Sequence, residues 1–310
     1  MISQNIIRRI RERNTLKSGK LKKLKKPPKW LFPNSSEREY RAALFSFTFE
    51  IRKLITENLL PAIPNFLREA TQTYPDPVDP QISFDMQSRN DNFIDQLNNL
   101  MRNIQILLLP KQQQTITKAA RIGADIAIFN ETQFQKTINS VLGVDIFLDE
   151  PYLLTQVELF ANQNAQLITS LAETEFDRVS GIVQRGLQEG SSYGSITEDI
   201  QKSFGITRRH AKLIARDQTT KLNGSLTKLR QQELGIEEFE WQTSGDERVR
   251  QSHRVLDGKI CRWDDPTVFK NSKNGEWIKR STIGGTEKNT SQDVNCRCVP
   301  IPILEGFFDA

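Results

Sequence analysis

Apolar residues recur every three or four positions along most of this chain, which is the spacing of an amphipathic α-helix. The clearest stretch carries Phe93, Ile94, Leu97, Leu100, Met101, Ile104, Leu107 and Leu108. The same spacing predicts further helices over residues 112–134, 151–186, 196–201 and 207–232. Most of the chain is therefore predicted to be helical.

An earlier helix is expected to begin at Asn34. Two serines follow this residue and then Glu37, and such residues suit the positive N-terminal end of a helix. Phe45, Phe49 and Ile55 come next at helical spacing. We expect these three side chains to lie in the core.

Prolines and glycines divide the predicted helices. Three prolines between Tyr74 and Pro80 predict a loop or an extended linker. The apolar run before Pro110 ends at that proline, so separate helices are expected on either side of it. Gly224 is a candidate interruption within the last helix.

The period changes from helical to alternating after Gly235. Phe239 and Trp241 alternate with polar residues, which is typical of a strand. The segment 299–304 is also β-prone, but Pro300 and Pro302 confine it to the edge of a sheet. Trp241, Trp263 and Trp277 are predicted to form the core of this small region.

The predicted fold class is mainly α, with a long helical body, a small C-terminal α+β module and a basic N-terminal arm. The expected boundaries are 1–33 for the arm, 34–235 for the helical body and 236–310 for the module. A chain of 310 residues has room for about two domains. No apolar run approaches the ~18 residues that a membrane span needs, and no secretory signal is recognisable, so no membrane partner is expected.

Positive charge is concentrated in the first tenth of the chain. Residues 1–29 hold eleven basic residues and one acidic residue, whereas the remainder holds 32 basic and 37 acidic residues. Such a segment is a candidate for non-specific contact with the phosphates of double-stranded DNA. There are two alternatives: the segment binds an acidic protein partner, or it is a solvated tail with no specific role. The candidate DNA contacts are Arg8, Arg9, Arg11, Arg13, Lys17, Lys20, Lys22, Lys23, Lys25, Lys26 and Lys29.

All three cysteines and one of the two histidines lie close together near the C-terminus. Thiolate and imidazole are ligands that Zn²⁺ prefers, and a closed structural zinc site has four of them. Cys-x-Cys side chains point to opposite faces of an extended strand, so the chain would have to turn there. Buried free thiols and a disulfide remain alternatives, although the odd number weighs against the disulfide. The candidate zinc ligands are His253, Cys261, Cys296 and Cys298.

A series of short motifs surrounds these residues. In order they are Asp246-Glu247-Arg248-Val249-Arg250, His253, Leu256-Asp257-Gly258-Lys259, Trp263-Asp264-Asp265-Pro266 and Cys296-Arg297-Cys298. Over residues 180–303 the chain resembles the phage Mu protein F-like family of head morphogenesis proteins. Many members carry His-Pro-Gly before the Cys-Arg-Cys, where this chain has Asn289-Thr290-Ser291.

The resemblance implies a phage minor head protein that lacks catalytic activity. Its partners would be the portal protein, the major capsid protein or both, with no small-molecule substrate. It would reside in the virion head, and in the host cytoplasm during assembly.

Two other classes of function compete with this interpretation: a zinc-dependent nuclease and a free-standing, non-specific DNA-binding protein. Asp246, His253 and Cys261 could be assembled on paper into an acid, a base and a nucleophile. The chain lacks the Walker A loop, the Gly-x-Ser-x-Gly elbow and the His-Glu-x-x-His helix, which weighs against an enzyme. Arg248 and Arg250 could bind phosphate or carboxylate, or could pair internally with aspartates of the module.

Overall fold

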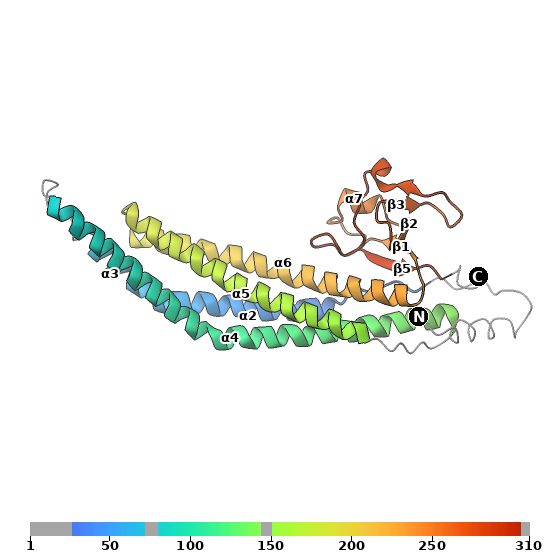
Figure 1. Ribbon diagram of the computed structural model, residues 1–310, viewed down its shortest axis with the longest axis horizontal. Helices are drawn as coiled ribbons and strands as arrows, with labels where there is room; N and C mark the ends of the chain where they lie inside the picture. Colours follow the sequence, from blue (N-terminus) through green and yellow to red (C-terminus); the bar gives the residue numbers. More distant parts are fainter. Residues whose placement is uncertain (1–26, 72–79, 144–150, 305–310) are drawn as a thin grey trace, which may run out of the picture. The chain divides into compact units, whose positions relative to one another are not determined.

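A computed structural model describes residues 27–71, 80–143 and 151–304 (Figure 1). The candidate DNA contacts from Arg8 to Lys26 lie outside the described residues, and so does most of the proline-rich stretch after Tyr74. Lys29 is described, and its side chain is exposed.

The described chain is mainly helical, with a small sheet near its C-terminus. The helices are α2 (Asn34–Asn58), η1 (Leu60–Ala62), α3 (Ile63–Thr71), α4 (Pro80–Leu142), α5 (Pro151–Gln188), α6 (Tyr193–Glu233), α7 (Gln251–Arg254) and η2 (Arg280–Ile283). The strands are β1 (Glu238–Gln242), β2 (Ile260–Arg262), β3 (Val268–Lys270), β4 (Ile278–Lys279) and β5 (Val299–Pro302). The predicted mainly α class, with a long helical body and a small C-terminal sheet, is confirmed. None of the helices in the described ranges is long and apolar enough to span a membrane.

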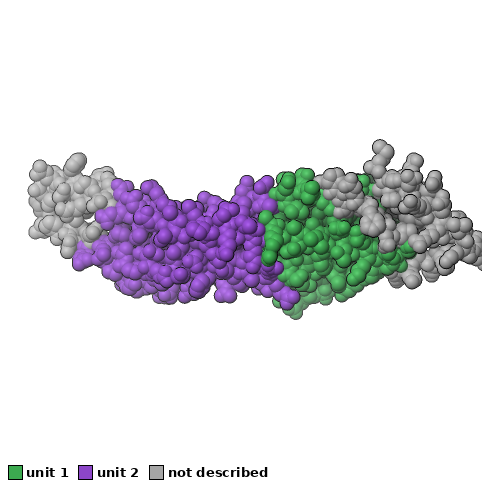
Figure 2. Space-filling model, turned by 90° about the horizontal axis from the view of Figure 1, so that it is seen from below, with its two compact units in different colours: residues 1–37, 120–160, 216–310 green, residues 38–119, 161–215 purple. Residues whose placement is uncertain are grey.

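The contacts within the chain define two compact units, which Figure 2 distinguishes by colour. Unit 1 comprises residues 1–37, 120–160 and 216–310, and unit 2 comprises residues 38–119 and 161–215. The boundaries expected from the sequence follow the change of hydrophobic period near residue 235. The contacts instead group the last turns of α4 and α6 with the sheet.

Unit 2 is a helical bundle that contains segments of α2, α4, α5 and α6. The buried stripe of α2 includes Tyr40, Leu44, Phe47, Ile51 and Ile55. The prediction that Phe49 lies in the core is wrong, because this side chain is 64% exposed. Phe45 is half-buried beneath the guanidinium of Arg208, 4.6 Å from its ring centroid. The true stripe is therefore offset around the helix from the predicted one.

Buried polar contacts join the helices of unit 2. Glu175 of α5 is fully buried and accepts hydrogen bonds from Arg178 and from Ser203 and Thr207 of α6. The Tyr40 hydroxyl donates to Asn164, which joins α2 to α5. Because an unpaired carboxylate in such a position would be costly, these contacts fix how α5 and α6 pack.

Two predicted helix breaks are absent from the structure. Helix α4 continues through Pro110, because its buried stripe stays in register on both sides, from Leu108 to Thr115. Helix α6 also continues across the gap expected between the predicted helices 196–201 and 207–232, because Ser203 and Thr207 are both hydrogen-bonded to Glu175. Tertiary packing thus outweighs the local cost of proline or glycine within a helix.

The sheet is antiparallel throughout, with the strand order β4-β3-β2-β1-β5. Phe239 and Trp241 of β1 are fully buried, as the alternating pattern predicts. Strand β5 lies at the edge, and its two prolines pair opposite Phe239 and Trp241. The core prediction is correct for Trp241 and Trp263 but not for Trp277, which is only half-buried and lies within 4.7 Å of Lys270.

Helix α6 holds the sheet within unit 1. The Gln231 side-chain amide donates to the Pro300 carbonyl at 2.9 Å and accepts from the Trp263 indole at 3.0 Å. An apolar cluster that includes Phe134 of α4 and Val299 of β5 lies beside these contacts. The ends of the long helices therefore complete the core of the small sheet.

Gly224 does not interrupt α6, contrary to its candidate role. A Cβ atom built on Gly224 would lie 2.3 Å from the Cβ of Ser291, which is far inside normal contact. Ser291 itself has φ 68°, in the left-handed region that favours glycine. The glycine at position 224 thus lets the loop before β5 approach the helix closely.

We expect Gly224→Ala to lower the free energy of unfolding by about 2 kcal/mol or more, because the added methyl group overlaps Ser291. Ser291→Gly removes the overlapping atoms and relieves the positive φ, so the double variant should recover most of the loss. Chemical denaturation of the four proteins measures the coupling. Gly205→Ala is the matched control: its Cβ would meet only Arg209 at 3.7 Å, so this variant should be neutral or more stable. An equal loss in both backgrounds would contradict the contact.

Candidate functional site

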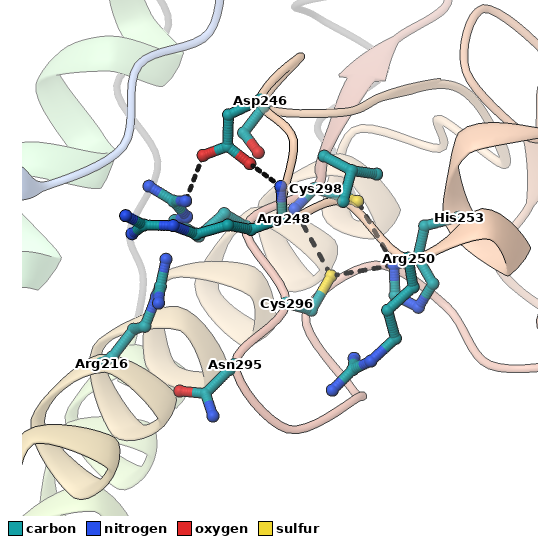
Figure 3. A pocket seen from close by; sticks show the side chains of 11 residues that line it. Arg216, Asp246, Arg248, Arg250, His253, Asn295, Cys296 and Cys298 are labelled. Carbon is teal, nitrogen blue, oxygen red and sulfur yellow. Dashed lines mark hydrogen bonds and ion pairs between the residues drawn. The ribbon is translucent and has the colours of Figure 1, made fainter. Parts of the chain in front are cut away.

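A histidine and two cysteines converge in unit 1. The ligand atoms of His253, Cys296 and Cys298 all lie within 4.8 Å of one another, and all three residues are buried. The His253 Nδ1 atom lies 3.4 Å from the Cys298 sulfur and 3.5 Å from the Cys296 sulfur (Figure 3). This arrangement is a group that could hold a metal ion.

Short local structures bring these residues together. His253 is carried by α7, a single turn that follows the Arg250 segment. The two cysteines follow a tight turn, in which Asn295 has φ 59° and the Cys296 N–H donates to the Asp293 carbonyl at 3.1 Å. The turn places both sulfurs beside one ring nitrogen, as the Cys-x-Cys spacing requires for a shared ligand.

The other ring nitrogen of His253 faces a carboxylate. Its Nε2 atom lies 2.9 Å from the Asp293 carboxylate, which also accepts from Lys288 at 3.0 Å and from Thr286 at 3.1 Å. The hydrogen bond with Cys296 raises the pKa of His253, against the opposing effect of burial. With Nε2 donating to Asp293, Nδ1 is oriented toward the two sulfurs.

The pKa values of the two thiols in the cluster are shifted in opposite directions. The hydrogen bond between them lowers the pKa of Cys296 and raises the pKa of Cys298. The Cys298 backbone N–H also donates to the Cys296 sulfur at 3.4 Å. Cys296 is therefore stabilised as a thiolate, which is the form that binds metals.

Cys261 does not belong to this group. It lies on β2, fully buried among Phe239, Trp241 and Phe269. Burial raises the pKa of the Cys261 thiol to about 11, so it is protonated at neutral pH. All three cysteines of the described chain are free thiols. The structure thus brings together three of the four predicted ligands and places the fourth in the core.

Arg280 supports the loop that carries the cluster. Its side chain is fully buried, and it donates to the carbonyls of Val268 at 3.0 Å, Lys288 at 2.9 Å and Thr286 at 3.3 Å. Its guanidinium carbon lies 5.4 Å from the ring centroid of Trp241. This arginine ties β3 to the segment that precedes the Cys-Arg-Cys motif.

The cluster faces a cavity of about 110 Å³ rather than a closed interior. His253, Cys296 and Cys298 form one part of its wall, and Arg216, Arg248 and Arg297 form another. Figure 3 shows the guanidinium groups of Arg216 and Arg248 pointing toward one another, away from the two sulfurs. Metal-binding and cationic side chains therefore share one pocket.

Two aspartates of the module that were alternative partners for Arg248 and Arg250 form other contacts. Asp257 accepts from Thr243, and Asp264 forms an ion pair with Arg262. In the described structure Arg250 donates to the Val294 carbonyl at 2.8 Å. Asp246 instead pairs with Arg297 and accepts from the Arg248 backbone N–H at 3.1 Å.

Residues 177–301 match the family described as Phage Mu protein F like protein. This part of the chain is similar to the phage Mu protein F-like family. Residues 177–301 include all of α6, the sheet except Pro302, the His/Cys/Cys cluster and the arginines of the pocket.

Three relatives share parts of this chain. An uncharacterized protein of Haemophilus influenzae is 30% identical over 180 residues, which are 57% of this chain and 36% of that protein. Minor head protein GP7 of Bacillus phage SPP1 is 26% identical over 158 residues, which are 50% of this chain and 46% of that protein. NAD(+)–arginine ADP-ribosyltransferase EFV of Enterococcus faecalis is 30% identical over 133 residues, 42% of this chain and 26% of that protein. The chain thus spans less than half the length of each relative. No solved structure matches it significantly.

Three residues of this site are not among the candidate site residues predicted from the sequence. Arg216 precedes the Cys-Arg-Cys motif by about eighty positions and resembles any arginine on an amphipathic helix. Arg280 lies in a polar stretch that indicates surface, yet it is fully buried. Asp293 could have been suspected from its place three residues before Cys296, within the motif itself.

Proposed function

We propose that this protein is a phage minor head protein that acts in head morphogenesis and binds the portal protein, the major capsid protein or both. The match of residues 177–301 to the phage Mu protein F-like family carries the proposal. The similarity to minor head protein GP7 of Bacillus phage SPP1, over half of this chain, supports it. The protein would enter the virion head after assembly in the host cytoplasm.

Helix α4 offers a surface for such a protein partner. Ile106, Leu107 and Leu109 are 56%, 57% and 54% exposed, within about one turn of α4. Contiguous exposed apolar side chains of this kind are typical of protein interaction sites. We propose that this part of unit 2 contributes to binding in the assembling head.

Co-expression with the portal and major capsid proteins of the same phage should yield heads that contain this chain. Ile106→Ser combined with Leu109→Ser should reduce its amount in purified heads several-fold, because the apolar contact is lost. Leu213→Ser, which changes an exposed leucine on α6, is the control and should be incorporated normally. Quantitative mass spectrometry of the heads gives the measurement. Heads that lack the unmodified chain altogether would rule out the proposed function.

The basic arm is proposed to contact DNA non-specifically, because residues 1–29 carry a net charge of +10. Binding to duplex DNA should weaken as the salt concentration rises. The slope of log affinity against log salt concentration should be about −0.9 for each phosphate that the arm neutralises. Replacing Lys22, Lys23, Lys25 and Lys26 by glutamine keeps the length of the arm and should flatten the slope markedly. The same four replacements at exposed lysines elsewhere serve as the control. An unchanged slope in the arm variant would exclude this role.

The cluster is proposed to hold one structural Zn²⁺ through His253 Nδ1, Cys296 and Cys298. Two sulfurs and one imidazole suit zinc, and the Asp293 carboxylate on Nε2 is the usual outer partner of a zinc-bound histidine. The ion would link α7 to the loop before β5. Such a link would stabilise a sheet that has few residues of its own to bury.

Purified protein should contain about one zinc per chain, by elemental analysis. His253→Ala, Cys296→Ser and Cys298→Ser should each lose the metal and lower the melting temperature. Cys261→Ser should retain it, because this thiol lies outside the cluster. Equal loss of zinc in Cys261→Ser would restore the four-ligand site, and a chain that never contains zinc would refute the metal altogether.

One observation favours a second function, a zinc-dependent nuclease. Three protein ligands beside a pocket are the arrangement in which a metal keeps a position for water. The carboxylates of the pocket region are engaged, however: Asp246 pairs with Arg297 and Asp293 with His253, so neither is available as a general base. Zinc-dependent cleavage of DNA or RNA that disappears in His253→Ala would favour the nuclease.

A further inference from the structure

The pocket beside the cluster contains more positive than negative charge. Four arginines line it, against one aspartate and the Cys296 thiolate, which leaves an excess of two positive charges with His253 neutral. The aspartate, Asp246, is already occupied by the Arg297 side chain and by the backbone N–H of Arg248. Glu37 lies outside the lining and offsets part of the charge at Arg216. The acidic side chains among the described residues therefore do not balance the positive charge of the arginines in this pocket.

Arg216 is the least satisfied of these side chains. It projects from α6 and is half-buried, and its Nε atom is buried without a hydrogen-bond partner among the described residues. A buried donor without an acceptor is costly. Burial, followed by the nearby charges of Arg297 and Arg248, lowers the pKa of Arg216. Helix α6 therefore holds a half-buried guanidinium group whose Nε donor has no acceptor among the described residues.

We propose that Arg216, Arg248 and Arg297 form a binding site for a phosphate group. Guanidinium groups present paired N–H donors that match the oxygens of phosphate. A doubly charged phosphate offsets most of the positive excess, whereas one carboxylate would leave much of it. The proposed phosphate site is inferred from the positions of the arginines and does not require a metal at the His/Cys/Cys cluster.

The size and position of the pocket agree with this ligand. A volume of about 110 Å³ suits a single phosphate-sized group, since cavities near 150 Å³ hold a molecule as large as benzene. Arg248, Arg250 and Ser244 are exposed, so the pocket can be entered from solvent. Val249 is its single aliphatic lining residue, which leaves little surface for the side chains of a bound peptide.

Free inorganic phosphate and the 5′-terminal phosphate of a nucleic acid present the same chemistry. Isothermal titration of the full chain, with its metal content determined, can distinguish them. The probes are inorganic phosphate, a short single-stranded oligonucleotide with a 5′-phosphate, and the same oligonucleotide with a 5′-hydroxyl. Acetate and an acidic peptide test for carboxylate recognition.

Phosphate should bind to the unmodified chain, and Arg216→Met should weaken this binding about tenfold or more through the loss of charged hydrogen bonds. Arg209→Met removes an exposed arginine of the same helix and should leave the binding unchanged. Tighter binding of the 5′-phosphorylated oligonucleotide than of its 5′-hydroxyl form would support the site and assign the phosphate to a nucleic-acid end. Equal binding of the two, with inorganic phosphate still bound, would support a free phosphate.

Three results would overturn the proposal. One is the absence of phosphate binding at millimolar concentration in a protein sample that is shown to be folded by its cooperative unfolding transition. Another is tighter binding of the acidic peptide than of phosphate, which would make the pocket a carboxylate site. The third is phosphate binding that persists in Arg216→Met and disappears on chelation, which would assign the phosphate to a metal. Zinc analysis of the same samples separates failure of this site from failure of the metal site.

Discussion

The close contact between Ser291 and Gly224 is the constraint on which the site depends. It seats the loop of residues 289–298 directly on α6, and the Asn295 N–H adds a second attachment to Asp217 at 3.1 Å. The same loop carries both cysteines of the cluster, while α6 supplies Arg216 about two turns before the glycine. A larger residue at either position would move the sulfurs and the guanidinium apart together.

The small sheet obtains its stability from polar groups as much as from apolar burial. Arg280 satisfies three carbonyl groups while lying over the Trp241 ring, and Gln231 connects Trp263 to the edge strand. Each of these groups is buried, so removal of one partner would leave another without a hydrogen bond. This network also restricts the sheet to one orientation on the helix ends within unit 1.

The sequence predicts elements well where one period dominates and poorly where distant segments decide. The alternation around Phe239 and Trp241 and the prolines of β5 correctly indicate a strand and its edge position. Breaks are predicted at Pro110 and between residues 201 and 207, because the packing that keeps the helices continuous there comes from other helices. Phe49 is placed in the core because apolar residues on α2 exceed what one face can bury. Local rules contain none of this tertiary information.

Some residues of the candidate site can also be predicted from the sequence, whereas others are recognisable only in the folded chain. Composition identifies the histidine and the cysteines, because these types are rare in the chain and gather in one stretch. Composition cannot separate Cys261 from the others, since thiols in a core and thiols at a metal site are the same residue type. Arg216 and Arg280 belong to abundant types, and their surroundings distinguish them only after folding.

The Cys-Arg-Cys motif places two kinds of ligand group on alternating positions of one short segment. The sulfurs of Cys296 and Cys298 lie beside His253, while Arg297 between them reaches Asp246. A ligand that shifts the backbone at the two sulfurs would also shift Arg297, and a ligand that shifts Arg297 would shift the sulfurs. Thermodynamic linkage then requires reciprocity: an ion that improves anion binding by some factor must itself be bound more tightly by the same factor when the anion is present. Three consecutive residues would thus make the chain sensitive to two solutes at once.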